Sequence, residues 1–277
     1  AVIAAIAVSS SPAVLIHVAH EMGASGPVTE RAKSLVALNN VLAFLIFSAL
    51  LPLLYSNADA PLVTILGGPV YQLLGSALLG GGMGMALHIA ARKTKAAHQY
   101  HLALVVGAVA FTLGAAMTLK LSTLFAPLVL GIVVRSIERT DLIADIEFGP
   151  AFELFFIALF VYAGANLHVA EMIQYAPAAL VLVLGRSLAK WLGVGITASL
   201  LGTPKQQAAT TGLLLIPMAG LAIGLADTTL TLFQIEGAVV SSVVLAAVAA
   251  LETIGPPISA KALRWSGDTL KQDPAYE

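Results

Sequence analysis

The chain has 277 residues, of which 58% are hydrophobic and 10% charged, and its mean hydropathy is +0.92. Soluble domains carry about 25% charged residues, so this composition excludes a water-soluble fold and predicts several membrane spans of about 20 residues each. The net charge of −1 implies no bulk attraction to nucleic acid. The absence of cysteine excludes disulfides and thiol chemistry.

Polar interruptions divide the chain into nine expected spans, which predicts an all-α membrane protein with about nine transmembrane helices. The spans cover residues 1–21, 34–54, 61–91, 102–119, 122–136, 150–167, 176–201, 207–226 and 237–258. In the third span, Gly67, Gly68 and Pro69 predict an irregular entry. When the loops are assigned alternately to two sides, every loop Lys and Arg except Lys120 falls on one side. That side, which includes the C-terminus, is expected to be cytoplasmic.

Two spans contain interruptions at mid-depth. The first has Ser-Ser-Ser-Pro from Ser9 to Pro12, and the eighth has Pro-Met-Ala-Gly from Pro217 to Gly220. Proline removes an amide donor and bends a helix, and a simple kink is one explanation for each interruption. The two spans run in opposite directions in opposite halves of the chain. Such a pair favours a secondary transporter whose binding site lies at the midplane between inverted repeats.

Four polar side chains lie deep inside other expected spans. Asn39 and Asn40 interrupt an apolar run in the second span, while Arg186 and Lys190 share one helix face in the seventh. Hydrocarbon offers an amide no hydrogen-bond partner, so we expect the asparagines to face a polar interior. The two cations either face the same interior or pair with backbone carbonyls.

Glu252 lies one turn before Pro256, near the expected cytoplasmic end of the ninth span. We expect an interfacial or structural carboxylate there, and a role in ion coupling is the alternative. The chain shows no nucleophile–base constellation and no metal-ligand spacing. These patterns predict a membrane transporter rather than an enzyme, with no cofactor and no metal beyond a transported monovalent cation.

Seven segments resemble the sodium/hydrogen exchanger family of the monovalent cation:proton antiporter superfamily. They are Ala7–Leu15, Glu21–Glu30, Leu35–Ala43, Phe155–Leu167, Gly185–Gly193, Leu215–Gly224 and Leu251–Pro256, in the family's order along nearly the whole chain. The resemblance implies two inverted repeats with crossing broken helices, homodimers and elevator-like alternating access. Residues 1–55 and 171–258 would form the core, 56–170 the linker and dimerisation helices, and 259–277 a cytoplasmic tail. The chain starts with Ala1 in an apolar stretch, so we expect a longer parent whose N-terminal spans are missing here.

The resemblance also implies an ion site by position. Ser10, Ser11, Pro12, Pro217 and Met218 would belong to the crossing breaks, and Arg186 or Lys190 would be the core cation. Asn39 and Asn40 occupy the place of a carboxylate pair that family members usually have as Asp-Asp or Asn-Asp. This departure matters because a carboxylate can bind either a cation or a proton, whereas an amide does not titrate.

Three alternatives follow from the amide pair. In the first, another carboxylate, Glu252 or one upstream, titrates and Na⁺ or K⁺ exchange for H⁺ persists. In the second, the protein is a passive pathway, a scaffold, a sensor or an inactive member. In the third, Arg186 and Lys190 suit the core to an anion. The expected partners are a monovalent cation, a proton, the lipid bilayer and a second copy of the chain, in a bacterial inner membrane.

Overall fold

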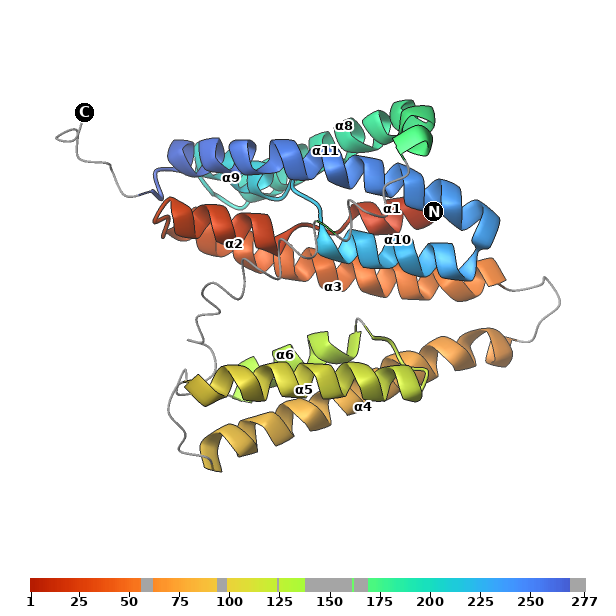
Figure 1. Ribbon diagram of the computed structural model, residues 1–277. Coiled ribbons are helices and arrows are strands. Elements are labelled where there is room, and N and C mark those ends of the chain that lie inside the picture. Colours follow the sequence, from red (N-terminus) through yellow and green to blue (C-terminus); the bar gives the residue numbers. More distant parts are fainter. Residues whose placement is uncertain (56–61, 94–98, 124, 138–160, 162–168, 270–277) are drawn as a thin grey trace. The chain divides into compact units, whose positions relative to one another are not determined.

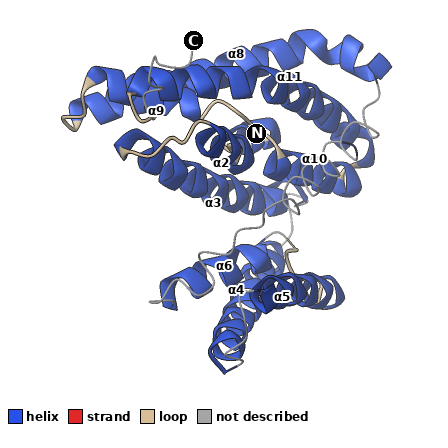
Figure 2. Ribbon diagram, turned by 60° about the vertical axis from the view of Figure 1, so that its left-hand side comes forward, coloured by secondary structure: helices blue, strands red, loops and turns tan. Residues whose placement is uncertain are grey.

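The computed structural model describes residues 1–55, 62–93, 99–123, 125–137, 161 and 169–269. Over these residues the regular elements are all helices (Figure 2), which confirms the all-α class. Five helical stretches are long and apolar enough to cross a membrane: Val2–Glu21, Pro27–Leu50, Val70–Lys93, Ile173–Leu200 and Glu236–Ser266. Shorter apolar helices occupy Leu102–Thr118, Phe125–Ile137 and Gly220–Leu232. The sixth expected span, residues 150–167, falls outside the described residues except for residue 161.

The chain divides into two compact units, one of Ala1–Phe47 with Leu159–Glu277 and one of Ser48–Ala158. The first unit contains α1 (Val2–Ala7), α2 (Pro12–Glu21), most of α3 (Pro27–Tyr55), α8 (Val169–Leu200), α9 (Lys205–Leu214), α10 (Gly220–Leu232) and α11 (Gln234–Ser266) (Figure 1). The second contains the end of α3 with α4 (Leu62–Lys93), α5 (Gln99–Thr118) and α6 (Phe125–Ile137). The core and dimerisation roles expected for such parts remain predictions.

In the second unit, α4 and α6 pack backbone against backbone. A Cβ atom on Gly80 would lie 2.1 Å from the carbonyl oxygen of Ala126, and one on Gly84 would lie 3.0 Å from that of Leu130. Glycine at these two positions is what lets the helices approach so closely. The irregular entry expected at Gly67–Pro69 is wrong, because α4 runs unbroken from Leu62. Proline is tolerated inside such apolar helices, where neighbouring groups and small backbone adjustments satisfy the freed carbonyl.

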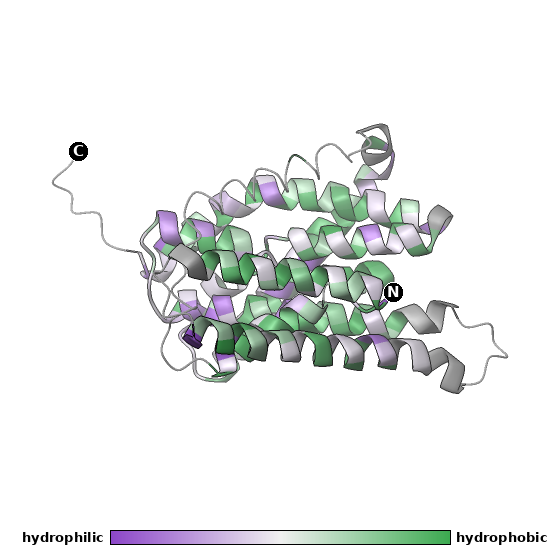
Figure 3. Ribbon diagram, turned by 60° about the horizontal axis from the view of Figure 1, so that its bottom comes forward, coloured by the Kyte–Doolittle hydropathy of each residue, from purple (hydrophilic) through white to green (hydrophobic). Residues whose placement is uncertain are grey.

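In the first unit, a hydrophobic core joins α2, α3, α9 and α11. Its fully buried side chains include Leu15, Val28, Leu214 and Leu263. Hydrophobic residues line most of each helix, and hydrophilic ones gather toward helix ends (Figure 3). This core fixes the helices that surround the two breaks, so the breaks are held from outside by apolar packing.

The C-terminal end of α11 is tied to the N-terminal end of α3. The backbone N–H and the hydroxyl of Thr29 both donate to Oδ2 of Asp268, at 2.7 and 2.8 Å, and Asp268 is only 8% exposed. A Cβ atom on Gly26 would lie 2.5 Å from that carboxylate, so glycine leaves it room. The helix thus continues past the expected end of the ninth span at residue 258, and part of the expected tail, residues 259–266, is helical.

Candidate functional site

The first break separates α1 from α2 and is built from its own serines. The Ser9 hydroxyl donates to the carbonyl oxygen of Ile6 at 2.8 Å, near the end of α1. Ser11 caps α2, because its hydroxyl accepts the N–H of Val14 at 3.3 Å, and Pro12 takes the first helical position. Proline fits there because the N–H it lacks would have no partner within the helix. The sequence Ser-Ser-Ser-Pro therefore ends one helix and starts another, as predicted.

The second break separates α9 from α10 and has an apolar character. Leu215, Ile216 and Met218 are almost fully buried, and Pro217 supplies no backbone N–H. The helix restarts after Ala219, whose backbone (φ −148°, ψ −122°) lies outside the helical region. Because no hydroxyl lies in this break, its carbonyl groups need donors from other elements.

The two breaks touch each other directly. The backbone N–H of Ser11 donates to the carbonyl oxygen of Pro217 at 2.8 Å, and the Ser10 hydroxyl donates to that of Leu215 at 3.0 Å. The interrupted helices of the two halves therefore meet at their non-helical segments. This is the mid-helix arrangement that the paired interruptions predicted.

Arg186, on α8, binds carbonyl groups of both breaks. Its Nε donates to Ala7 at 2.9 Å and one terminal nitrogen donates to Ser9 at 2.5 Å. The guanidinium also donates to the carbonyl oxygens of Ile216 and, at 3.4 Å, of Pro217. The residue is 6% exposed, so its charge is held by carbonyl dipoles rather than by water. The carbonyl groups at the ends of α1 and α9 carry partial negative charge, which suits a cation.

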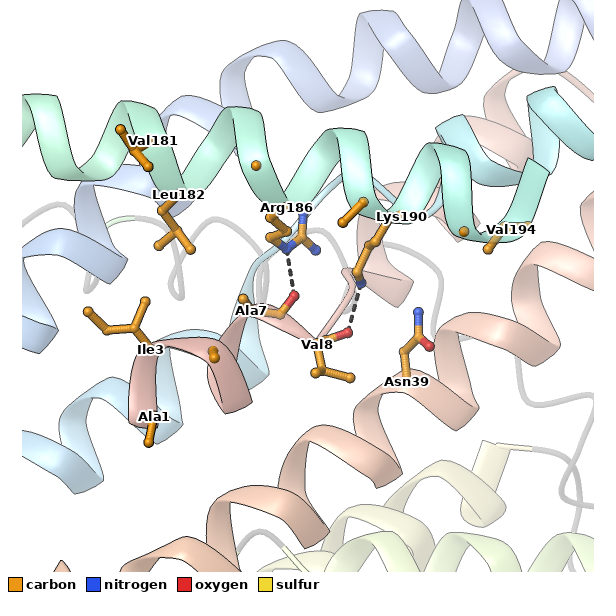
Figure 4. A pocket seen from close by; sticks show the side chains of 14 residues that line it. Ala1, Ile3, Ala7, Val8, Asn39, Val181, Leu182, Arg186, Lys190 and Val194 are labelled. Atoms are coloured by element: carbon orange, nitrogen blue, oxygen red, sulfur yellow. Dashed lines mark hydrogen bonds between the residues drawn. The ribbon is translucent and has the colours of Figure 1, made fainter. Parts of the chain in front are cut away.

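Lys190, one turn further along α8, binds the first break alone. Its Nζ lies 2.7 Å from the carbonyl oxygens of Val8 and of Ser9 and 2.5 Å from the Ser10 hydroxyl oxygen. Figure 4 shows the two cationic side chains reaching from α8 toward this break. Both cations are thus paired with backbone carbonyls, and both also line a cavity.

Asn39 and Asn40 reach the same break from α3. The Oδ1 atom of Asn40 accepts the backbone N–H of Ser10 at 2.9 Å, and Nδ2 of Asn39 donates to the Ser10 hydroxyl at 3.3 Å. Ser10 therefore contacts α3, α8 and the second break at once. Both amides are half-buried.

An open cavity of about 780 Å³ lies beside this contact. It is lined by the end of α1, by a stretch of α8 that includes Arg186 and Lys190, and by Asn39 of α3 (Figure 4). Asn39 of α3 and Lys190 of α8 both line this cavity beside the first break. The cavity therefore reaches the first break at Val8.

The structure thus gathers most of the predicted site residues at one crossing. Glu252 is the exception, since it has no hydrogen bond to the others in the described part of the chain. The sequence did not indicate which carbonyl groups take part, notably those of Val8 and Ile216. Only the nearby proline and serines hinted that carbonyl groups would be left without helical partners at these points.

The comparisons with known proteins identify the family of the chain. A family described as "Sodium/hydrogen exchanger, transmembrane" matches residues 1–264. A search among curated proteins found no match. Because the family match covers nearly the whole chain, the resemblance drawn from the seven segments is confirmed. The chain belongs to the sodium/hydrogen exchanger family and is a multi-pass membrane protein of the cation:proton antiporter class.

Proposed function

We propose that this chain exchanges a monovalent cation, Na⁺ or K⁺, for protons, and that the transported cation competes with the Lys190 ammonium for the same oxygen atoms. One observation carries the proposal. Two carbonyl oxygens and one hydroxyl oxygen, from Val8, Ser9 and Ser10, converge on Nζ of Lys190 at 2.5 to 2.7 Å. Neutral oxygens converging on a single positive charge are also the ligands that a dehydrated K⁺ or Na⁺ takes.

The charge balance of this competition accounts for exchange without a carboxylate pair. An ammonium group that releases its proton becomes a neutral amine and no longer needs the three oxygens. A cation that replaces it leaves the total charge beside Arg186 unchanged, whereas a cation added to the protonated lysine would meet two positive charges. Lysine suits this role because it can lose its proton inside a protein, which arginine does not do.

The amides would serve as neutral ligands in this scheme. Within the described residues no hydrogen bond uses Oδ1 of Asn39, and that side chain lines the cavity. The atom is thus available to a cation that enters beside Lys190. Asn40 would act by orientation, because its Oδ1 holds the backbone N–H of Ser10.

The same contacts favour a cation over an anion as the substrate. All three donors of Lys190 are taken by oxygens of the first break, and the guanidinium of Arg186 binds four carbonyl groups. An anion would have to displace these bonds to reach the two positive charges. We further propose, from the family resemblance, elevator-like movement in a homodimer whose C-terminus is cytoplasmic, in a bacterial inner membrane.

The test is exchange in proteoliposomes that contain a pH-sensitive dye. We expect addition of Na⁺, K⁺ or Li⁺ to move protons through the wild-type protein. Lys190→Arg should retain the charge but abolish exchange, because arginine keeps its proton, and Lys190→Gln should abolish it as well. Lys33→Gln, which alters an exposed lysine paired with Glu30, is the matched control and should exchange normally.

Two results would contradict the proposal. Absence of proton movement with all three ions in the wild type would favour a scaffold, a sensor or a passive pathway instead. Normal exchange by the Lys190→Arg protein would show that the proton is carried elsewhere.

A further inference from the structure

Glu252 lies near the middle of α11, not near its end. The helix continues through Pro256 and Pro257 to Ser266, so the carboxyl group lies well inside the apolar stretch Glu236–Ser266. The two prolines do not end this helix, and the expectation of an interfacial or structural carboxylate at Glu252 stays a prediction. Proline within a membrane-spanning helix bends it without stopping it when neighbouring groups satisfy the backbone.

The carboxyl group of Glu252 has an atom with no partner. Its Oε1 is buried and has no hydrogen bond within the described residues. On the same helix face, two turns further on, the hydroxyl oxygen of Ser259 is also buried without a partner. The side chain as a whole is half-buried, and a charged oxygen that is buried without a partner is costly, which favours the protonated form.

This face of α11 packs against the second break. Gly255 lies between Glu252 and Ser259, and a Cβ atom there would lie 3.1 Å from both Cβ and Cγ of Pro217. The same proline is held through its carbonyl oxygen by Ser11 and Arg186. Pro217 is therefore contacted by α11 through its ring carbons and by the crossing through its carbonyl group.

Glu252 is in no ion pair among the described residues. The ionisable side chains that neighbouring helices present are of two kinds. Those of α2, α9 and α10 are exposed: His17, His20, Glu21, Lys205 and Asp227. The two cations of α8 are Arg186 and Lys190, whose charged groups are bound to the carbonyls of the breaks. On α11 itself, Glu236, Lys261 and Arg264 are exposed. Among the described residues, no cation therefore lies within ion-pair distance of Glu252.

We propose that Glu252 is a second proton-binding site of this protein, placed against the Pro217 break and separate from Lys190. In the arrangement described here it is a neutral carboxylic acid. It forms an O–H bond with a proton taken from water and returns that proton to water when it ionises. Its use in transport rests on the proposed function: the exchange rate would depend on pH through Glu252 as well as through Lys190.

Infrared difference spectroscopy of the reconstituted protein tests the proton directly. We expect the wild type at neutral pH to show a carbonyl stretch of a protonated carboxylic acid that disappears as the pH is raised. Glu252→Gln should lack this band, and Glu236→Gln, which alters an exposed residue in the first turn of the same helix, should retain it. A wild-type spectrum with no band that depends on Glu252 would overturn the proposal, whatever the transport result.

Transport measurements then separate this proposal from the proposed function. If the wild type exchanges ions, Glu252→Gln should lose part of the pH dependence of the rate, while Glu236→Gln keeps the wild-type profile. An unchanged profile in Glu252→Gln would exclude Glu252 from the exchange cycle. If the wild type moves no protons with any cation, the proposed function fails, and the infrared band still decides whether Glu252 binds a proton.

Discussion

The two breaks interrupt helices in the two halves of the chain but are stabilised in different ways. In the first, Ser9, Ser10 and Ser11 each use their hydroxyl in a hydrogen bond. In the second, Ile216 and Met218 are buried apolar residues, and the carbonyl groups accept from Ser10, Ser11 and Arg186, all of which lie outside that break. One break thus supplies polar side chains and the other supplies only backbone oxygens.

In this protein, the crossing of the two broken helices therefore has polar side chains on one partner only. The serines of the first break satisfy part of the second, and α8 supplies the positive charge for both. The second break can therefore remain apolar and pack closely against α11 at Gly255. Four substitutions would break or sharpen this comparison.

The largest effect is expected from Arg186→Met, because this residue donates to both breaks. Its loss leaves buried carbonyl groups at Ala7 and Ile216 without donors, and hydrogen bonds to charged groups contribute about 1.5–3 kcal/mol each. We expect the free energy of unfolding to fall by about 4 kcal/mol. Unfolding monitored in detergent measures it, with Arg92→Met, an exposed residue of α4, as control. A fall no larger than that of the control would mean that water replaces the guanidinium.

The second largest effect is expected from Met218→Ala, which tests the apolar character of the second break. Met218 is fully buried, and truncation of such a side chain leaves a cavity that costs about 3 kcal/mol. Met117→Ala, at a residue that is 70% exposed, is the control and should change stability by less than about 0.5 kcal/mol. Equal effects of the two substitutions in the same unfolding assay would show that the second break is not held by packing.

Ser10→Ala tests the polar character of the first break. The substitution removes the acceptor of Lys190 and Asn39 and the donor to Leu215. A buried group left without its partner costs about 1–3 kcal/mol, so we expect a loss of about 2 kcal/mol. Ser34→Ala, which removes an exposed hydroxyl bonded to the carbonyl of Glu30, should cost much less. If the two substitutions lower the free energy of unfolding equally, the hydrogen bonds of Ser10 do not hold the crossing together.

The smallest effect is expected from Asn40→Asp, which leaves the breaks intact and adds a charge beside them. An oxygen remains to accept the N–H of Ser10, so the fold should be retained. The negative charge near the oxygens of the first break should raise cation affinity about tenfold, measured by titration calorimetry or by the cation dependence of exchange. Exchange that appears only in this variant would show that the wild type does not exchange. Unchanged affinity would mean that residue 40 is remote from the ion.

The sequence predicted the elements of the site better than their contacts. The breaks at Ser9–Pro12 and Pro217–Gly220 follow from local chemistry, since proline and serine act on the adjacent turn. The shared face of Arg186 and Lys190 follows from helical spacing alone. Their carbonyl partners could not be predicted, because each of those contacts joins segments far apart in the chain.

The mistaken expectations share one physical cause. Gly67–Pro69 suggested an irregular entry and the ninth span was expected to end at residue 258, yet α4 continues through Pro69 and α11 through Pro256 and Pro257 to Ser266. Proline ends helices reliably in water, where unsatisfied carbonyl groups are hydrated, whereas an apolar medium favours the helix that leaves the fewest such groups.

The two hydrogen bonds that Thr29 donates to Asp268, which cap the start of α3, have a mechanical consequence. They fix the axial offset between α3, which carries the asparagine pair, and α11, which carries Glu252. A slip of one helix along the other by a single residue, about 1.5 Å, would break both hydrogen bonds of the cap. The two helices must therefore shift together, so the polar groups of one half of the chain keep their depth relative to the carboxyl group of the other.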